Sequence, residues 1–439
     1  YEIRLSLVGS DMCIRDSFCT FAKTNIFQPV MRYIHKIHIN KIRHLQNIDI
    51  PIENDLYPHL ILTGKNGSGK TSVLEAVANH LQNIANDPYK NFLSLEQRIK
   101  YYQDQLNNGS NSIDNERGLE DNKKQYASYF GEVKIDFYNI DDFISKYQKG
   151  NFIIAFYQAN RKVVINEPLN PTKPTIKEVW STKEIATIEF LNFLSDLKIQ
   201  EALARNEKLN HEADLINTWF VDFEKLLKKV FQDEALQLLF NYKDYSFQIL
   251  TQGKTFKFTE MSDGFAAVLE IIIDLILKMQ RKETLTRAYQ QEGIVLIDEV
   301  ETHLHLELQR LVLPLLTQLF PNIQFIVTTH SPFVLNSIGN AVAFDLEHQQ
   351  LVDDLTEYSY ESLAEGYFGV RTSSSYAEMQ LDKLKKLLEK ETLLSSEKSE
   401  LKSLINDFDK IPEVVSPLIV GEYLRLKNQY IAVINSLEV

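Results

Sequence analysis

A glycine-rich segment that ends in a lysine and a threonine carries the strongest chemical signal in this sequence of 439 residues. Glycines allow backbone N–H groups to curl around phosphate oxygens, the lysine of such a segment reaches the β- and γ-phosphates of a nucleotide, and the hydroxyl ligates Mg²⁺. We therefore expect a nucleotide-phosphate site; the alternative is a glycine-rich turn with a chance lysine. The residues fit the pattern G-x-x-x-x-G-K-[ST] and are Gly64, Lys65, Asn66, Gly67, Ser68, Gly69, Lys70 and Thr71.

The flanks of this segment supply the context that the pattern requires. Residues 59–63 form an apolar run that predicts a buried strand, and residues 72–81 carry an apolar stripe at helical spacing. A strand, a loop and a helix in that order bring the positive end of the helix to the phosphates.

Two carboxylates follow a second apolar run. Residues 294–297 predict a buried parallel strand, and Asp298 and Glu299 come directly after it. Sheets of α/β proteins present ligands at the carboxyl ends of their strands. We therefore expect Asp298 to hold Mg²⁺ and Glu299 to orient or deprotonate the water that attacks in phosphoryl transfer. Without the phosphate loop, the same pair would be equally typical of a solvated strand end.

A histidine stands in the corresponding place after a third apolar run. Residues 323–327 predict a strand that leads into Thr328-Thr329-His330-Ser331-Pro332. Because this strand end lies on the same side of the sheet, we expect His330 to sense the γ-phosphate. The alternative is a structural histidine.

Together with Met261-Ser262-Asp263-Gly264-Phe265, these features resemble the ATP-binding-cassette ATPase heads of the structural-maintenance and RecF-like group, over roughly residues 33–336. The resemblance implies an α/β P-loop NTPase fold, with a mixed sheet flanked by helices, that binds ATP and Mg²⁺ and hydrolyses ATP. It also implies a head-to-tail homodimer that encloses two ATP molecules between phosphate loop and signature. The family signature is Leu-Ser-Gly-Gly-Gln, so Ser262 and Gly264 match and the other three positions depart. Asp263 adds a negative charge at that contact.

The same resemblance places two further residues at the nucleotide. The glutamine that contacts the metal falls on Gln158, after a predicted strand at residues 152–157, and the phosphate-contacting arginine falls on Arg43. Each also has a plain alternative, because Gln158 would equally suit a polar strand end and Arg43 a solvated surface.

A narrower resemblance concerns the local sequence around the acidic pair Asp298-Glu299. Residues 298–305, residues 328–332 and the Ser-Asp-Gly signature resemble most closely bacterial ATPases grouped with overcoming-lysogenization and Septu-type phage-defence proteins. This implies an ATP-driven switch that works with a separately encoded nuclease or toxin. The rival hypothesis is a RecF-like repair ATPase that binds duplex DNA. His303 and His305 form an H-x-H pair without an evident third metal ligand, which favours contacts at the dimer interface over a metal site.

Composition narrows the class of protein. The net charge of −13, from 47 basic and 60 acidic side chains, opposes nonspecific attraction to nucleic acid but leaves room for a local basic groove. No apolar run is long enough for a membrane span, and sparse cysteines, Cys13 and Cys19, suit a reducing cytoplasm. A small-molecule kinase or GTPase is disfavoured because no N-K-x-D motif is present, and a transporter ATPase because no membrane segment accompanies the motifs.

The ends of the chain differ in pattern from its middle. Residues 6–17 resemble translated sequencing-adapter DNA, so we expect Met31 to be the natural start; a disordered native tail is the alternative. Residues 376–408 have Leu, Lys and Glu at helical spacing, and Asp353 and Asp354 are adjacent, so on a strand they would face opposite sides. We therefore expect no nuclease site after His330, and helices that form either a docking surface or a solvated cap.

The expected organisation has seven parts. They are an extension at 1–30, an N-terminal ATPase half at 31–90, a polar insertion at 91–130, core strands at 131–170, a helical lobe at 171–245, a C-terminal ATPase half at 246–345 and a helical region at 346–439. Within these parts we expect two short helices in the insertion, a strand pair at residues 133–138 and 152–157, and a hairpin at residues 246–250 and 255–258.

Overall fold

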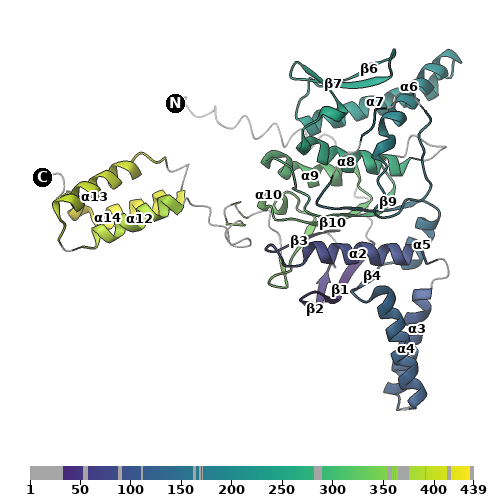
Figure 1. The fold of residues 1–439 in the computed structure, drawn as a ribbon, viewed down its shortest axis with the longest axis horizontal. Helices are drawn as coiled ribbons and strands as arrows, with labels where there is room; N and C mark the ends of the chain where they lie inside the picture. The colour runs from purple at the N-terminus through teal and green to yellow at the C-terminus, as the bar shows by residue number, and fades with distance from the viewer. Residues whose placement is uncertain are drawn as a thin grey trace, which may run out of the picture. The chain divides into compact units, whose positions relative to one another are not determined.

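The chain forms two compact units, Tyr1–Glu357 and Tyr358–Val439, and each is described by itself (Figure 1). In the computed structural model, no described helix is long and apolar enough to cross a membrane. The predicted extension, both cysteines and the pair Asp353-Asp354 lie outside the described residues. These are 33–439 without 53–57, 88–90, 110–111, 162–164, 168–169, 171, 281–288, 353–357, 359, 361, 364–374, 391, 413–416 and 436–439.

A six-stranded sheet in the order β12-β11-β3-β10-β9-β5 forms the centre of the first unit. All neighbours pair in parallel except β11 and β12, which are antiparallel. Continuous apolar runs suit strands that are covered on both faces, and every residue of β3, β5 and β10 is buried. The strands are β3 (His59–Thr63), β5 (Phe152–Tyr157), β9 (Glu292–Ile297), β10 (Ile323–Thr328), β11 (Ala341–Asp345) and β12 (Gln350–Val352).

A second, antiparallel sheet has the order β2-β1-β4, with β1 (Ile34–Ile42), β2 (Leu45–Pro51) and β4 (Val133–Phe137). Helix α2 (Lys70–Ala85) lies between the two sheets, and its apolar residues join both in one buried cluster (Figure 1). The predicted α/β P-loop architecture, with a mixed sheet flanked by helices, is thereby confirmed.

One predicted strand pairing is wrong. The sequence suggested that the strands near residues 133–138 and 152–157 form a pair, but β4 pairs with β1 and β5 pairs with β9. Helix α5 (Ile140–Gln148) separates them and was not predicted. Asn139 caps this helix by accepting from the Asp142 N–H at 3.0 Å, and two aspartates follow in its first turn.

The polar insertion forms a hairpin of two helices, α3 (Asn91–Asn107) and α4 (Ile113–Phe130), longer than the short helices expected. The predicted helical lobe contains α6 (Phe190–Asn206) and α7 (Asn210–Phe231), and the expected hairpin is β7 (Ser246–Thr251) with β8 (Lys254–Lys257). An unpredicted strand, β6 (Gln237–Asn241), completes that small sheet. The remaining elements are η1 (Thr187–Glu189), η2 (Phe258–Glu260), α8 (Asp263–Met279), α9 (Leu306–Leu319) and α10 (Pro332–Leu335).

The second unit is helical, as the sequence predicted for most of the region after residue 345. Its buried cluster includes Leu384, Leu401 and Tyr423. Strand β12 is the exception within that region, because it pairs with β11 of the first unit's sheet. The helices are α12 (Ser375–Leu388), α13 (Ser395–Phe408), α14 (Pro417–Gln429) and α15 (Ile431–Asn435).

Candidate functional site: a phosphate loop beside two acidic strand ends

The phosphate loop joins β3 to α2, as its motif predicts. Gly64, Gly67 and Gly69 have φ of 132°, 85° and 99°, a region that L side chains rarely adopt. Gly69 is the N-cap of α2, and a Cβ there would lie 2.8 Å from Leu45 Cδ1. The loop therefore needs glycine both for its curl and for the close approach of the β1–β2 turn.

The amine of Lys70 lies inside this loop. Lys70 Nζ donates to the carbonyl oxygen of Gly64 at 2.8 Å and to that of Lys65 at 3.1 Å. Burial lowers the pKa of Lys70, and the charges of Glu299, Glu301, Asp298 and Asp345 oppose that shift. The buried ammonium of Lys70 is thus surrounded by several carboxylates. It can exchange its contacts with the two carbonyl oxygens for contacts with phosphate oxygens.

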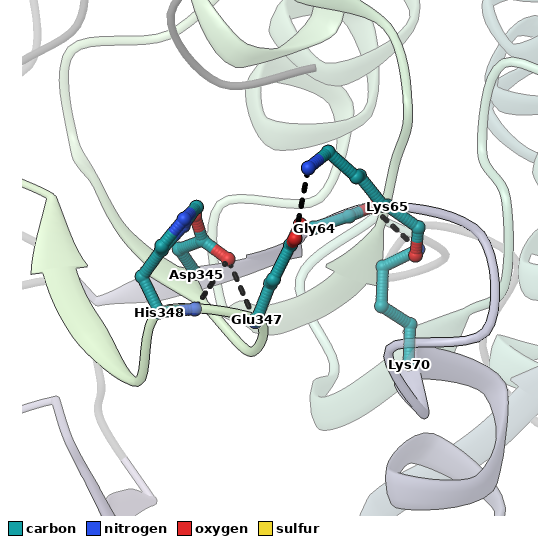
Figure 2. A network of polar contacts seen from close by, with 6 residues as sticks. All are labelled: Gly64, Lys65, Lys70, Asp345, Glu347 and His348. Atoms are coloured by element: carbon teal, nitrogen blue, oxygen red, sulfur yellow. Dashed lines mark hydrogen bonds and ion pairs between the residues drawn. The ribbon is translucent and has the colours of Figure 1, made fainter. Parts of the chain in front are cut away.

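A turn that the sequence did not predict packs against the first glycine of the loop (Figure 2). At the end of β11, the buried Asp345 accepts from the Glu347 N–H at 2.8 Å and pairs with His348 Nδ1 at 2.7 Å. A Cβ on Gly64 would lie 3.3 Å from Asp345 Oδ1. Lys65 Nζ pairs with Glu347 Oε1 at 2.9 Å, so a backbone contact and an ion pair join this turn to the phosphate loop.

Two threonine hydroxyls converge on the first strand-end carboxylate. Thr71 Oγ1 donates to Asp298 Oδ1 at 3.2 Å, and Thr328 Oγ1 donates to the same oxygen at 2.7 Å. Asp298 is buried, and its N–H donates to the carbonyl of Tyr157 on β5 at 2.8 Å. The structure therefore unites the end of the phosphate loop with the strand end of β9, as the sequence predicted. Hydroxyl and carboxylate oxygens are the donors that Mg²⁺ prefers, so this pair of side chains fits the ion.

The second carboxylate stands on an unusual backbone. Glu299 has a φ of 45°, and non-glycine residues persist in that region only where their surroundings fix them. Its N–H donates to Thr328 Oγ1 at 2.7 Å, and its carboxylate accepts from Thr302 Oγ1 at 3.2 Å. A threonine hydroxyl thus contacts Glu299 on its N–H and another on its carboxylate, directly after the strand end that bears Asp298.

His330 lies at the neighbouring strand end, as predicted, and a third carboxylate fixes its loop. Glu301 accepts from Thr329 Oγ1 at 2.8 Å and from the His330 N–H. Burial raises the pKa of Glu301. Burial and the charge of Lys70 lower the pKa of His330, which keeps its ring neutral and able to accept or donate a hydrogen bond at neutral pH. Sequence reasoning missed Glu301, although it follows the acidic pair by two positions.

Two weaker assignments fall near the site. The register pairs Tyr157 with Ile297, so Gln158 follows the strand next to Asp298, and it is exposed. Arg43 is exposed in the β1–β2 turn at a φ of 51°, and the neighbouring His44 and Leu45 approach Gly69. Both are therefore near the expected nucleotide, while a metal contact for Gln158 and a phosphate contact for Arg43 stay predictions.

The signature segment forms the N-terminus of α8. Ser262 is the N-cap and is exposed, and its hydroxyl makes no capping hydrogen bond within the described chain. A Cβ on Gly264 would lie 2.9 Å from the carbonyl oxygen of His303, so only glycine lets α8 approach the turn after Glu299 so closely. Phe265, where the signature departs, stacks on Phe231 of α7 with ring centroids 4.4 Å apart.

The H-x-H pair has structural roles within the chain. His305 is the N-cap of α9, and its Nδ1 accepts from the Leu308 N–H at 3.4 Å. His303 supplies the carbonyl that Gly264 approaches, at a φ of 67°. Among the described residues no group of three or more His, Cys, Asp or Glu side chains is placed to hold a metal ion. A contact of either histidine with a partner subunit stays a prediction.

With this geometry in place, similarity to known proteins becomes informative. Residues 182–336 match the AAA_21 family model, described as "AAA domain, putative AbiEii toxin, Type IV TA system". This part of the chain is thus similar to a domain of that family. The matched stretch contains the signature, both strand-end carboxylates and His330, and the phosphate loop precedes it.

Several curated proteins are similar to the chain over longer stretches. Septu protein PtuA of Bacillus mycoides (strain KBAB4) is 25% identical over 417 residues, which are 91% of this chain and 54% of that protein. A "Retron Vc95 probable ATPase" of Vibrio cholerae serotype O1 biovar El Tor is 26% identical over 246 residues, 55% of this chain and 44% of that protein. The chain therefore spans about half the length of these relatives.

Two further similarities concern repair and chromosome-maintenance proteins. The DNA replication and repair protein RecF of Acholeplasma laidlawii (strain PG-8A) is 24% identical over 345 residues, 68% of this chain and 94% of that protein. A crystal structure of an SmcHead bound to the C-winged helix domain of ScpA aligns over 73% of this chain and 97% of that chain, at 12% identity and a TM-score of 0.38. The fold is established by the strand order of the six-stranded sheet and by the phosphate loop between β3 and α2, and not by this structural alignment.

Proposed function

We propose that this chain binds ATP with Mg²⁺ and hydrolyses it. The observation that carries the proposal is the convergence of Thr71 Oγ1 and Thr328 Oγ1 on Asp298 Oδ1, beside the ammonium of Lys70. Backbone N–H groups of the phosphate loop and the N-terminus of α2 would hold the phosphates. Thr71 and Asp298, with Gln158, would hold Mg²⁺, which neutralises charge on the β- and γ-phosphate oxygens when bound.

Glu299 and His330, which lie next to this centre, take part in the hydrolysis itself. Glu299 orients or deprotonates the attacking water, because its carboxylate leaves the strand end next to Asp298 on a turn that is fixed at both its N–H and its side chain. His330 contacts the γ-phosphate as a neutral imidazole. Phosphoryl transfer depends mainly on such positioning and on charge neutralisation, so no covalent step on the protein is required.

The signature supports a dimeric switch. Ser262 is exposed at the N-terminus of the 17-residue helix α8, with its hydroxyl outside the capping contact, and such a helix end favours an anion. We infer that two subunits meet head to tail, so that Ser262 and Gly264 of one subunit face the γ-phosphate held by the other. ATP would close this dimer, and hydrolysis would open it.

The relatives favour phage defence as the setting. A Septu protein and two retron ATPases are among the similar proteins, and the chain covers only part of each. We propose that the ATP-bound dimer controls a separately encoded nuclease or toxin. The RecF similarity keeps a second candidate open, a repair ATPase that binds duplex DNA across the dimer.

The test compares two variants with the unaltered protein. Lys70→Ala should abolish ATP binding and turnover, because the phosphates lose their only assigned lysine. Glu299→Gln should bind ATP, hydrolyse it at least about 100-fold more slowly, and accumulate a dimer on ATP in light scattering. Unchanged hydrolysis by Lys70→Ala would remove the site assignment, and an ATP-bound Glu299→Gln monomer would remove the switch. DNA binding whose affinity falls steeply with salt would favour the repair candidate.

A further inference from the structure

Arg161 is a buried charged residue that the proposed chemistry does not use. It stands four residues after the end of β5 and is 9% exposed. Its guanidinium donates to three consecutive backbone carbonyls, to Asp298 at 3.3 Å, to Glu299 at 3.0 Å and to Val300 at 3.5 Å. Because a buried guanidinium that lost these hydrogen bonds would carry an uncompensated charge, its contacts with backbone oxygens fix the path of that backbone.

The backbone that Arg161 fixes is the strained turn of Glu299. A φ of 45° costs a non-glycine residue about 1 kcal/mol or more, so this turn relaxes unless contacts hold it. Thr328 Oγ1 accepts from the N–H of Glu299, and both Arg161 and the Thr302 N–H, the latter at 3.0 Å, donate to the Glu299 carbonyl. Removing the guanidinium would remove the side chain that joins the carbonyl of Glu299 to those of Asp298 and Val300, and would weaken the hold on the Glu299 turn.

The charge of Arg161 also interacts with a carboxylate on the signature helix. Glu270 on α8 is 1% exposed, and its charge is the largest of those that stabilise the charged form of Arg161 against burial. Burial raises the pKa of Glu270 to about 7, although the charge of Arg161 opposes this shift. Within the described residues, Glu270 Oε2 and Arg161 Nε are both buried and have no hydrogen-bond partner, so each keeps an unused polar atom.

Glu270 belongs to a polar stripe on an otherwise apolar helix. Glu270, Asp274 and Lys278 follow at intervals of four, which places them on one face of α8, and all three are buried. Asp274 pairs with Lys278 at 2.7 Å and accepts from Tyr157 OH at 2.6 Å. This stripe therefore ties α8 to β5, and Glu270 is the member closest in sequence to the signature.

We propose that Arg161 is a positioning residue that holds Glu299 in its hydrolytic orientation and connects it, through Glu270, to the signature helix α8. Engagement of the α8 N-terminus by the partner's nucleotide would move Glu270 relative to Arg161, and Arg161 would transmit that shift to the Glu299 turn. The inference rests on the proposed ATP hydrolysis and adds to it a connection within one subunit.

The first test separates positioning from binding and folding. Arg161→Gln should lower kcat about 10- to 100-fold, while KM and the affinity for an ATP analogue change less than about twofold, because the turn and not the phosphate loop is released. Arg161→Lys, which keeps the charge and one donor, should recover part of kcat. Arg205→Gln, an exposed arginine on α6, is the matched control and should leave all three values unchanged. An unchanged kcat in Arg161→Gln, or an equal loss of ATP affinity, would overturn the proposal.

The second test addresses the connection to α8. Glu270→Gln should lower kcat, and its effect should largely disappear in the Arg161→Gln background, because both substitutions break the same connection. Fully additive effects would overturn the coupling. The proposal is distinguishable from the proposed function, since loss of turnover in Lys70→Ala together with a normal kcat in Arg161→Gln would remove only the positioning role.

Discussion

Thr71 and Asp298 are 227 positions apart in the sequence, and Thr71 Oγ1 donates to Asp298 Oδ1 at 3.2 Å. The contact forms because β3, β10 and β9 are neighbours in parallel, so the helix that follows β3 begins beside the carboxyl end of β9. Thr328, at the end of the intervening strand, donates to the same oxygen. Three consecutive strands thus each contribute to one oxygen-lined point, which is where we place Mg²⁺.

The first prediction concerns that point. Thr71→Ala should lower the affinity for an ATP analogue about 10-fold or more in the presence of Mg²⁺ and much less in the presence of EDTA, because the substitution removes a metal ligand and leaves the phosphate loop intact. Fluorescence titration under the two conditions measures the difference. Ser128→Ala, an exposed hydroxyl on α4 that bonds within its own helix, is the control. Equal losses with and without Mg²⁺ would contradict the metal assignment.

The second prediction concerns the link between the acidic turn and His330. Glu301→Gln replaces one acceptor oxygen by an amide donor, which then faces either Thr329 Oγ1 or the His330 N–H. The loss of one hydrogen bond to a charged group is worth about 1.5–3 kcal/mol, so kcat should fall about 10-fold or more through misplacement of His330. Steady-state kinetics of ATP hydrolysis measure this.

The control for that substitution lies on the same segment. Glu307→Gln removes an exposed carboxylate from the first turn of α9 and should leave kcat unchanged. A Glu301→Gln protein with normal kcat would show that His330 does not depend on Glu301, and one that loses ATP affinity to the same degree would point to a general disturbance of the loop.

The sequence predicted the positions of the polar residues at the strand ends better than the contacts that support them. Continuous apolar runs that end in Asp298 and in His330 identify buried parallel strands, and parallel strands place their carboxyl ends at one edge whatever the loops do. Arg161 and Glu301 follow no such rule. Their roles depend on which carbonyl or N–H lies opposite in the folded chain, and no spacing in the sequence encodes that.

Some missed elements did carry a local signal. The run Ala341–Asp345 is apolar and ends in an aspartate, the same pattern that identified β9, and it forms β11. Asn139 with two aspartates after it is an N-cap followed by an acidic first turn, and it begins α5. The pairing of β4 and β5 was wrong because each strand found its partner in a different sheet, which short apolar runs cannot specify.

The third prediction separates two acidic residues at the turn beside the phosphate loop. Asp345→Ala should weaken ATP binding several-fold, because the buried carboxylate orders the turn that packs against Gly64. Glu347→Gln should have little effect, because an exposed ion pair such as that with Lys65 contributes about 0–1 kcal/mol. Titration with an ATP analogue ranks the two variants. The reverse order would mean that the ion pair, and not the buried carboxylate, holds the loop.

The last prediction concerns acid stability. His59 is 3% exposed at the start of β3, and its Nδ1 accepts from the Phe325 N–H of β10 at 3.1 Å. Burial lowers the pKa of His59 to about 4. In the unfolded chain the pKa of His59 has its ordinary value near 6.5. Between about pH 4 and pH 6.5 the unfolded chain therefore binds a proton at His59 and the native state does not. The contribution of neutral His59 to the stability is therefore fully present above about pH 6.5 and is lost as the pH falls toward 4.

At pH 5 the expected loss from His59 is about 2 kcal/mol in the free energy of unfolding relative to pH 7. In His59→Asn, the side-chain oxygen can replace Nδ1 as acceptor for Phe325 and does not titrate, so the loss between pH 7 and pH 5 should shrink by about that amount. Urea denaturation at the two pH values measures it. The buried His80, whose pKa burial lowers to about 3, titrates in both proteins and cancels in the comparison. An unchanged pH dependence in His59→Asn would show that His59 is not the buried neutral group on which the β3–β10 contact depends.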